Sequence, residues 1–228
     1  ATNLLLKLDP TVDGLKTGFT KAAGYNLALT ASRPATQIDM PNRRLVVVVL
    51  GAKNAFKRAE VAHKLMNLAY SYTRNEMAIK DKQLIAELPV IQSTLKMFQV
   101  AAKQPKFITT SLYASDQQID MSKFDHQTQR LIQTDAMGVK TILEPLQQTQ
   151  THMNVELITQ SLTAPLAQVM ELAQIQVYQD NKLIQTFSIT DQINIEEANW
   201  FERLINWFKQ LFSFGANAVE QAKIYPMN

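Results

Sequence analysis

Three adjacent residues near the N-terminus, Lys16-Thr17-Gly18, carry the groups that an active-site strand needs. They lie within "VDGLKTGFTKAAGYNLALTA", which also holds Gly14 and Gly24 although glycine weakens a strand. An ammonium and a hydroxyl at the edge of a cleft can bind a carboxylate or assist a proton transfer. A glycine beside them lets a substrate approach the backbone closely. The motif alone fits an exposed lysine before a turn better than an active-site strand, and both interpretations stay open at this point.

The composition excludes several other kinds of chemistry. The 228 residues contain no cysteine, which excludes disulfides, thiolate nucleophiles and cysteine-ligated zinc. The histidines His63, His126 and His152 are scattered without metal-ligand spacing, so we predict no metal site. The net charge of +3 comes without any run of like charges and gives no support for binding to nucleic acid.

Residues 1–75 are predicted to form three strands and a helix that position the Lys-Thr-Gly motif. The runs VDGLKTGFT and GYNLALTAS fit two short strands separated by the turn Thr20–Ala23. The β-branched run RRLVVVVLGA predicts a strand buried on both faces. In the helix AFKRAEVAHKLMNLAYSYTRN, apolar residues at three- and four-residue spacing predict one buried stripe of Val61, Leu65, Leu68 and Tyr72.

Residues 76–192 and 193–228 differ from the first segment in pattern. Short apolar runs broken by Pro, Asp, Asn and Gln predict that 76–192 form a β-rich sandwich of short strands, with a hairpin turn at Asp180-Asn181. In 193–228, Asn199 and Glu202 fit a helix N-cap and its capping-box partner. Such an amphipathic helix either packs on a core or lies at a membrane surface. Its candidate membrane-associating residues are Trp200, Phe201, Leu204, Trp207, Phe208 and Leu211.

Together these features resemble the penicillin-binding serine D-alanyl-D-alanine carboxypeptidases of low molecular mass. In that family a stretch of the form VDGxKTGxTxxAGY carries the third active-site motif, and this sequence reads VDGLKTGFTKAAGY. The run RLVVVVLGA, the helix FKRAEVAHKLMN and the C-terminal amphipathic helix follow in the family's order. The resemblance is close over residues 3–75 and looser through the β-rich region. It implies an α+β fold, in which a remnant of a β-lactamase/transpeptidase-like catalytic domain precedes a sandwich-like β-domain and the C-terminal helix.

The resemblance implies a role for each matching residue. Lys16 would hydrogen-bond the serine hydroxyl of the second motif and assist proton transfer, and Thr17 would bind the terminal carboxylate of the peptide. Gly18 would leave room for substrate. Phe19, where the family often has histidine, would donate its backbone N–H to the oxyanion. Arg58 in FKRAE matches an arginine that recognises the substrate carboxylate, although the spacing before it is one residue shorter than in the family.

The reaction implied by the resemblance needs groups that this sequence does not supply. It uses Ser-x-x-Lys, then Ser-x-Asn or Tyr-x-Asn, ahead of Lys-Thr-Gly. No serine precedes Lys16, and neither form of the second motif occurs in the sequence. The stretch Ser93–Lys96 has the first pattern, but it follows Lys-Thr-Gly in the β-rich region, where residues i and i+3 point to opposite faces of a strand. We therefore predict that the chain is the C-terminal portion of such an enzyme and is inactive alone.

The resemblance also predicts partners and location. The parent enzyme would remove the terminal D-Ala from peptidoglycan stem peptides ending in D-Ala-D-Ala through an acyl-serine intermediate, and β-lactams would acylate the same serine. No metal or organic cofactor is implied. The family's C-terminal helix favours the membrane interpretation, on the outer face of the bacterial inner membrane, in the periplasm. Two alternatives stay open: a related β-lactamase-fold hydrolase, and a non-catalytic, membrane-tethered module of the cell envelope.

Overall fold

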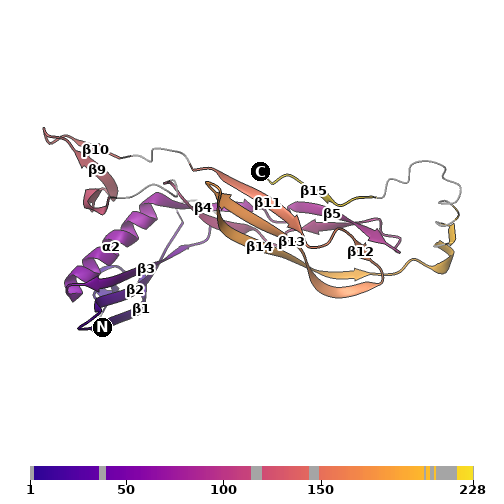
Figure 1. Cartoon of the computed structure of the whole chain (residues 1–228), viewed down its shortest axis with the longest axis horizontal. Helices are drawn as coiled ribbons and strands as arrows, with labels where there is room; N and C mark the ends of the chain where they lie inside the picture. The colour runs from indigo at the N-terminus through magenta and orange to yellow at the C-terminus, as the bar shows by residue number, and fades with distance from the viewer. Residues whose placement is uncertain are drawn as a thin grey trace. The chain divides into compact units, whose positions relative to one another are not determined.

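A computed structural model describes residues 3–35, 40–113, 120–143, 149–202, 204–205, 208 and 220–227. The chain divides into two compact units (Figure 1). Unit 1 comprises Ala1–Glu76 and Phe107–Thr149, and unit 2 comprises Met77–Lys106 and Gln150–Asn228. The sequence suggests a boundary near residue 75 but treats 76–192 as one segment. In the structure, Phe107–Thr149 instead groups with the N-terminal segment.

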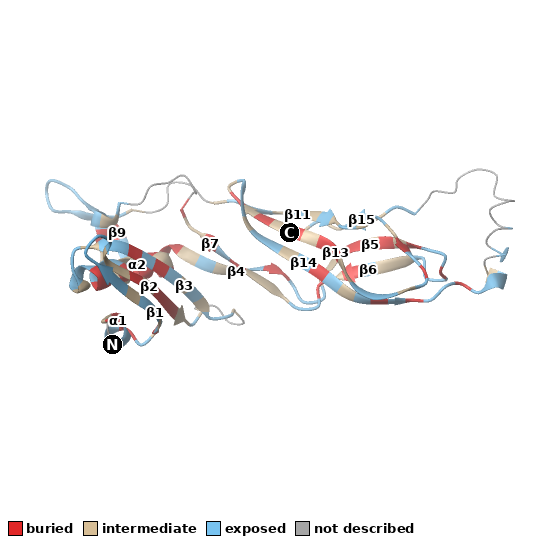
Figure 2. Cartoon of the chain, turned by 60° about the horizontal axis from the view of Figure 1, so that its bottom comes forward, coloured by how far each residue is buried: buried red, intermediate tan, exposed pale blue. Residues whose placement is uncertain are grey.

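Unit 1 is built on an antiparallel sheet in the order β1-β2-β3. The strands are β1 (Val12–Thr20), β2 (Gly24–Arg33) and β3 (Arg43–Ala52), and β1 follows the short helix α1 (Leu5–Leu8). Helix α2 (Ala55–Tyr72) follows β3 and packs with the sheet in one hydrophobic core (Figure 2). The predicted strands and helix of this segment are thus confirmed.

The face of α2 that packs on the sheet agrees with the predicted stripe only in part, because Leu65 packs against this core but Val61 does not. Val61 is 39% exposed, whereas Ala59, Ala62 and Met66 are buried with the sheet's core. Alanine has a small side chain, so it lets the helix backbone approach the sheet closely. Leu68 and Tyr72, the C-terminal half of the predicted stripe, lie instead in a second cluster whose other buried members are Tyr113, Phe124 and Leu131.

The β-branched run of β3 is buried on one face only. Val47 and Val49 belong to the core with α2. The alternate residues Val46, Val48 and Leu50 are exposed in the described chain. The prediction of a strand buried on both faces was therefore wrong for the described residues, where the other face of the sheet is open.

Short strands complete unit 1. Strands β4 (Thr73–Ile79) and β7 (Lys106–Ser111) pair with each other and carry the chain between the two units. The 3-10 helix η1 (Met121–Lys123) precedes a small antiparallel sheet of β8 (Phe124–Asp125), β9 (Arg130–Thr134) and β10 (Lys140–Ile142). The buried residues Phe124 and Leu131 of β8 and β9 bind this sheet to the end of α2.

The described residues of unit 2 form two sheets. One has the order β11-β13-β14, from β11 (Thr151–Leu157), β13 (Leu166–Gln179) and β14 (Lys182–Ile195). The other joins β12 (Leu162–Thr163), β5 (Leu84–Ile91) and β15 (Lys223–Ile224), with β6 (Met97–Ala101) also paired to β5. Both sheets contribute fully buried apolar residues, among them Leu88 and Ile175.

The predicted hairpin turn in unit 2 is confirmed. Asp180 and Asn181 have φ values of 49° and 63° and connect β13 to β14. Two consecutive positive φ angles are the signature of a type I′ turn, whose twist matches that of the flanking strands. Each of the two strands has 14 residues, so this hairpin is longer than the short strands expected from the sequence.

The C-terminal segment is described in part. Residues 200–202, 204–205 and 208 are helical, and the backbone N–H of Asn199 donates to Glu202 Oε2 at 3.3 Å, as in one half of a capping box. Trp200 and Phe201 are 76% and 57% exposed, and Leu204 and Phe208 are also exposed. Trp207 and Leu211 lie outside the described residues. Among the helices described, none is both long and apolar enough to span a membrane.

Candidate active-site strand

The Lys-Thr-Gly motif lies on β1, an edge strand of its sheet. Within the described residues β1 pairs with β2 alone, so its other edge is open. Thr17 lies opposite Leu27, which faces α2 in the core. Lys16 lies opposite Ala28, and side chains alternate along a strand, so Lys16 and Gly18 occupy the other face of the sheet. A ligand bound along the open edge of β1 can therefore reach Lys16 on one face of the sheet and Thr17 on the other.

The side chain of Lys16 is exposed and folded back along its own strand. Its Nζ donates to the carbonyl oxygen of Thr17 at 2.6 Å. No carboxylate forms an ion pair with Lys16 in the described part of the chain. A flexible ammonium with three donors keeps two of them for an incoming group. The arrangement fits a lysine that binds a carboxylate or transfers a proton at the edge of the sheet.

Gly18 and Phe19 complete the exposed part of the motif. A Cβ atom built on Gly18 has no neighbour within 4 Å, so the space beside this residue is open. The Phe19 side chain is exposed, and its ring centroid lies 4.4 Å from that of Tyr25 on β2. This aromatic contact holds the end of β1 against β2.

Asn26 is a positioning residue that the sequence did not single out. Its Oδ1 accepts from the Gly51 N–H at 2.9 Å, and its Nδ2 donates to the Gly24 carbonyl at 3.2 Å. Gly24 has a φ of +67°, and a Cβ there would lie 3.1 Å from the Ala52 carbonyl oxygen. The turn after the motif is thereby tied to the end of β3, and a side chain at Gly24 would be strained by the backbone and crowded by β3.

Comparisons with known proteins give a consistent result. No family model matches the chain. The chain is 31% identical to the D-alanyl-D-alanine carboxypeptidase DacF of Bacillus subtilis over 109 residues, which cover 48% of this chain and 26% of the relative. It is 25% identical to DacD of Escherichia coli over 198 residues, covering 86% of this chain and 40% of DacD. The chain is a homologue of the D-alanyl-D-alanine carboxypeptidases.

This carboxypeptidase homologue spans less than half the length of the curated relatives it matches. Among solved structures, penicillin binding protein 5 from Haemophilus influenzae matches it with a TM-score of 0.54 and 23% sequence identity, over 86% of this chain and 46% of that one. The likeness supports the α+β, transpeptidase-like fold class expected from the sequence.

Arg58 of α2 packs against β2, the strand that pairs with the motif strand β1. It is only 4% exposed, and its guanidinium lies 5.8 Å from the centre of the Tyr25 ring, with Nη1 donating to the Asn26 carbonyl at 3.4 Å. Tyr25 and Asn26 lie opposite Phe19 and Gly18 of β1, so Arg58 contacts the residues that pair with the motif.

Ser93 of this chain forms hydrogen bonds that serve the fold. It is buried, and its Oγ donates to the Glu196 carbonyl at 2.9 Å while it accepts from the Leu95 N–H at 3.2 Å. Ser93 lies between β5 and β6, and Lys96 is exposed. These contacts join two loops of unit 2 and give no sign of an activated nucleophile.

A polar cluster beside α2 also escaped the sequence-based search. Arg33 on β2 donates to Asp9 Oδ2 at 3.1 Å and to Asn67 Oδ1 at 2.7 Å, and His63 Nε2 lies 3.5 Å from Asp9 Oδ2. Burial acts to raise the pKa of Asp9, but hydrogen bonds from Thr11 and the charge of Arg33 outweigh it and hold the pKa below its usual value. Within the described residues, no cluster of His, Asp and Glu could hold a metal ion.

Proposed function

We propose that this chain supplies the Lys-Thr-Gly wall of a serine-type D-alanyl-D-alanine carboxypeptidase. The observation that carries the proposal is the exposed Lys16 on an open sheet edge, beside the open space at Gly18, in a homologue of proteins named for that activity. The substrate would be a peptidoglycan stem peptide ending in D-Ala-D-Ala, and β-lactams would acylate the same enzyme.

Each group of the strand has a task in this reaction. The nucleophilic serine attacks the carbonyl carbon of the D-Ala–D-Ala bond, the terminal D-Ala leaves, and water then hydrolyses the acyl-serine ester. Lys16 would hydrogen-bond the serine of the second motif and assist proton transfer. Thr17 would bind the terminal carboxylate at the open edge, and the Phe19 N–H would donate to the oxyanion. In this proposal the nucleophile and second motif come from residues outside the given sequence.

Labelling with a fluorescent penicillin tests the proposal. In the natural protein that contains this chain, we expect Lys16→Gln to slow acylation by about 100-fold or more, the usual loss when a proton-transfer group is removed. Lys21→Gln is the matched control, because Lys21 is an exposed lysine in the turn after β1. Equal labelling of the Lys16→Gln and Lys21→Gln proteins would contradict the role of Lys16. Labelling of the 228-residue chain by itself would contradict an external nucleophile.

We also propose that the C-terminal segment binds the outer face of the bacterial inner membrane, which places the protein in the periplasm. The support is the exposure of Trp200 and Phe201 on helical residues, since aromatic side chains at the headgroup level give interfacial affinity. The other candidate membrane-associating residues of this segment are Leu204, Trp207, Phe208 and Leu211.

Co-sedimentation with phospholipid vesicles tests the membrane proposal. Burying half of each aromatic side chain is worth about 1 kcal/mol, so Trp200→Ser with Phe201→Ser should weaken binding by about 30-fold. The control is Met137→Ser with Val139→Ser, which removes two exposed apolar side chains from the β9–β10 hairpin. Equal binding by both double variants would contradict attachment through this segment.

A further inference from the structure

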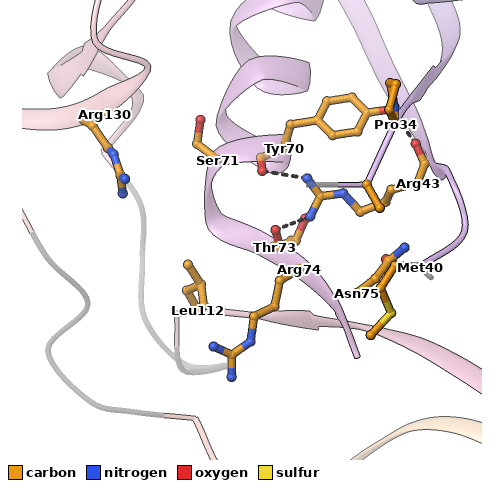
Figure 3. Close-up of a pocket in the computed structure, with 11 residues that line it drawn as sticks. Pro34, Met40, Arg43, Tyr70, Ser71, Thr73, Arg74, Asn75, Leu112 and Arg130 are labelled. Atoms are coloured by element: carbon orange, nitrogen blue, oxygen red, sulfur yellow. Dashed lines mark hydrogen bonds between the residues drawn. The ribbon is translucent and has the colours of Figure 1, made fainter. Parts of the chain in front are cut away.

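A polar pocket of about 360 Å³ lies at the C-terminal end of α2, within unit 1. Its volume is in the range of small-molecule sites. Three arginines from β3, β4 and β9, namely Arg43, Arg74 and Arg130, contribute to its lining (Figure 3). Tyr70 and Thr73, at the C-terminal end of α2, also line it.

Arg43 forms the fixed wall of this pocket. Its Nη2 donates to the Tyr70 carbonyl at 2.7 Å, and its Nη1 donates to the hydroxyl of Thr73 at 3.0 Å and also to the Thr73 carbonyl. The last carbonyls of a helix lack partners within the helix and carry partial negative charge. Arg43 therefore caps α2, and its hydrogen-bonding groups are largely used by the fold.

Arg130 is held at the opposite wall by packing of its neighbour. Leu131 is buried, and its backbone N–H donates to the Tyr72 hydroxyl at 2.9 Å. The Arg130 guanidinium itself lies 5.9 Å from the centre of the Tyr72 ring. Asp125, its cross-strand neighbour, is already bound by the backbone N–H groups of Gln127 and Thr128.

Arg74 is partly engaged. Its Nε donates to Glu76 Oε1 at 2.6 Å, and that carboxylate oxygen also accepts from the Thr110 hydroxyl at 2.8 Å. In Figure 3, Arg43 is bonded to other lining residues, whereas the guanidinium groups of Arg74 and Arg130 are not. Across the described residues, neither Arg43 nor Arg130 forms an ion pair with a carboxylate.

The charges of the pocket therefore do not balance. Arg43, Arg74 and Arg130 bring three positive charges, and Glu76 returns one negative charge. Arginine forks match the planar, bidentate geometry of carboxylates and phosphates. We propose that this pocket binds the anionic group of a small ligand, a phosphate or a carboxylate, with Arg74 and Arg130 donating to it. The inference is separate from the carboxypeptidase proposal, because it uses none of the Lys-Thr-Gly residues.

Titration calorimetry of the full 228-residue chain with inorganic pyrophosphate and with succinate tests this site. We expect saturable binding of at least one probe, and Arg74→Gln or Arg130→Gln should weaken it by about tenfold or more, as for the loss of a hydrogen bond between charged groups. Arg44→Gln is the matched control, since Arg44 is an exposed arginine on β3 paired with Asp13 at 2.8 Å. It should leave the affinity unchanged within about twofold, because Arg44 is not among the lining residues and its charge is already paired with that of Asp13.

The outcomes separate the possible sources of the anion. Tighter binding of pyrophosphate would indicate a phosphate, as in a lipid headgroup or phosphorylated polymer, and tighter binding of succinate would indicate a peptide-like carboxylate. Thermal unfolding of each variant shows whether it is folded. Absence of saturable binding to either probe, or equal weakening by Arg44→Gln, would overturn the proposal.

Discussion

The glycines of the β1-β2-β3 sheet are needed for different physical reasons. Alanine substitutions at three of these positions test the reasons separately. Gly24→Ala meets both a left-handed backbone, with φ +67°, and contacts at 3.1 and 3.2 Å from the Ala52 and Gly51 backbones. Gly51→Ala meets only the left-handed backbone, because φ is +70° and the atom nearest to the added Cβ would be 4.0 Å away. Gly18→Ala meets neither.

The magnitudes follow from these geometries. A left-handed conformation costs an alanine about 1 kcal/mol, so Gly51→Ala should lose about that much stability. The backbone contacts of Gly24→Ala force a shift of a packed sheet and should raise its total loss to about 2–3 kcal/mol. Gly18→Ala should be neutral or about 0.5 kcal/mol more stable, because alanine restricts the unfolded chain. For a chain of this size, Gly24→Ala should therefore lower the Tm by about 5–10 °C.

Thermal and urea unfolding of the three variants measure these differences, and penicillin labelling of the natural protein measures the role of Gly18. We expect Gly18→Ala to keep its stability and yet to label more slowly, because the added methyl group enters the space proposed for substrate. A Gly24→Ala loss no larger than that of Gly51→Ala would refute the close-contact argument. A loss of more than about 1 kcal/mol in Gly18→Ala would show that this glycine serves the fold, since no contact accounts for such a cost.

Two further predictions concern the supports of the sheet and of α2. Because the pKa of Asp9 is lowered in the folded state, its charge stabilises the protein fully above its ordinary pKa of 3.8 and loses this effect as the pH falls through the lower folded value. The stability difference between the unmodified chain and Asp9→Asn should therefore shrink in acid unfolding below that pH, and a constant difference would contradict it. Tyr72→Phe should cost about 1–3 kcal/mol in urea unfolding, because it leaves the buried Leu131 N–H without its acceptor. Tyr178→Phe is the control, since Tyr178 donates to a side chain, Gln176, at 2.8 Å, and an equal loss would contradict the argument.

Local patterns predicted the elements of this protein better than their grouping. Alternation and turn chemistry located β1, β2 and the β13–β14 hairpin, because each depends on neighbours in sequence. The return of Phe107–Thr149 to unit 1 depends on contacts such as that between Tyr72 and Leu131, 59 residues apart, which leave no periodic signal. Part of the buried face of α2 was missed because hydrophobicity favours Val61 over Ala59, whereas close packing on a sheet favours the smaller side chain.

The candidate site shows the same division between local and long-range information. Residue type alone left the motif open between an active-site strand and an exposed lysine before a turn, and the family resemblance selected Lys16 and Gly18. Their roles stay predictions, which the open edge of β1 and the open space at Gly18 support. The place of Arg58 was not predictable in this way, because a guanidinium at the start of α2 can point outward or lie over the Tyr25 ring, and only the packed structure selects the second. The arginines of the pocket come from three separate strands, so their shared charge exists only once α2 and β9 are packed together through Tyr72. A candidate site on one strand can thus be proposed from the sequence, whereas a candidate site assembled from several elements needs the fold.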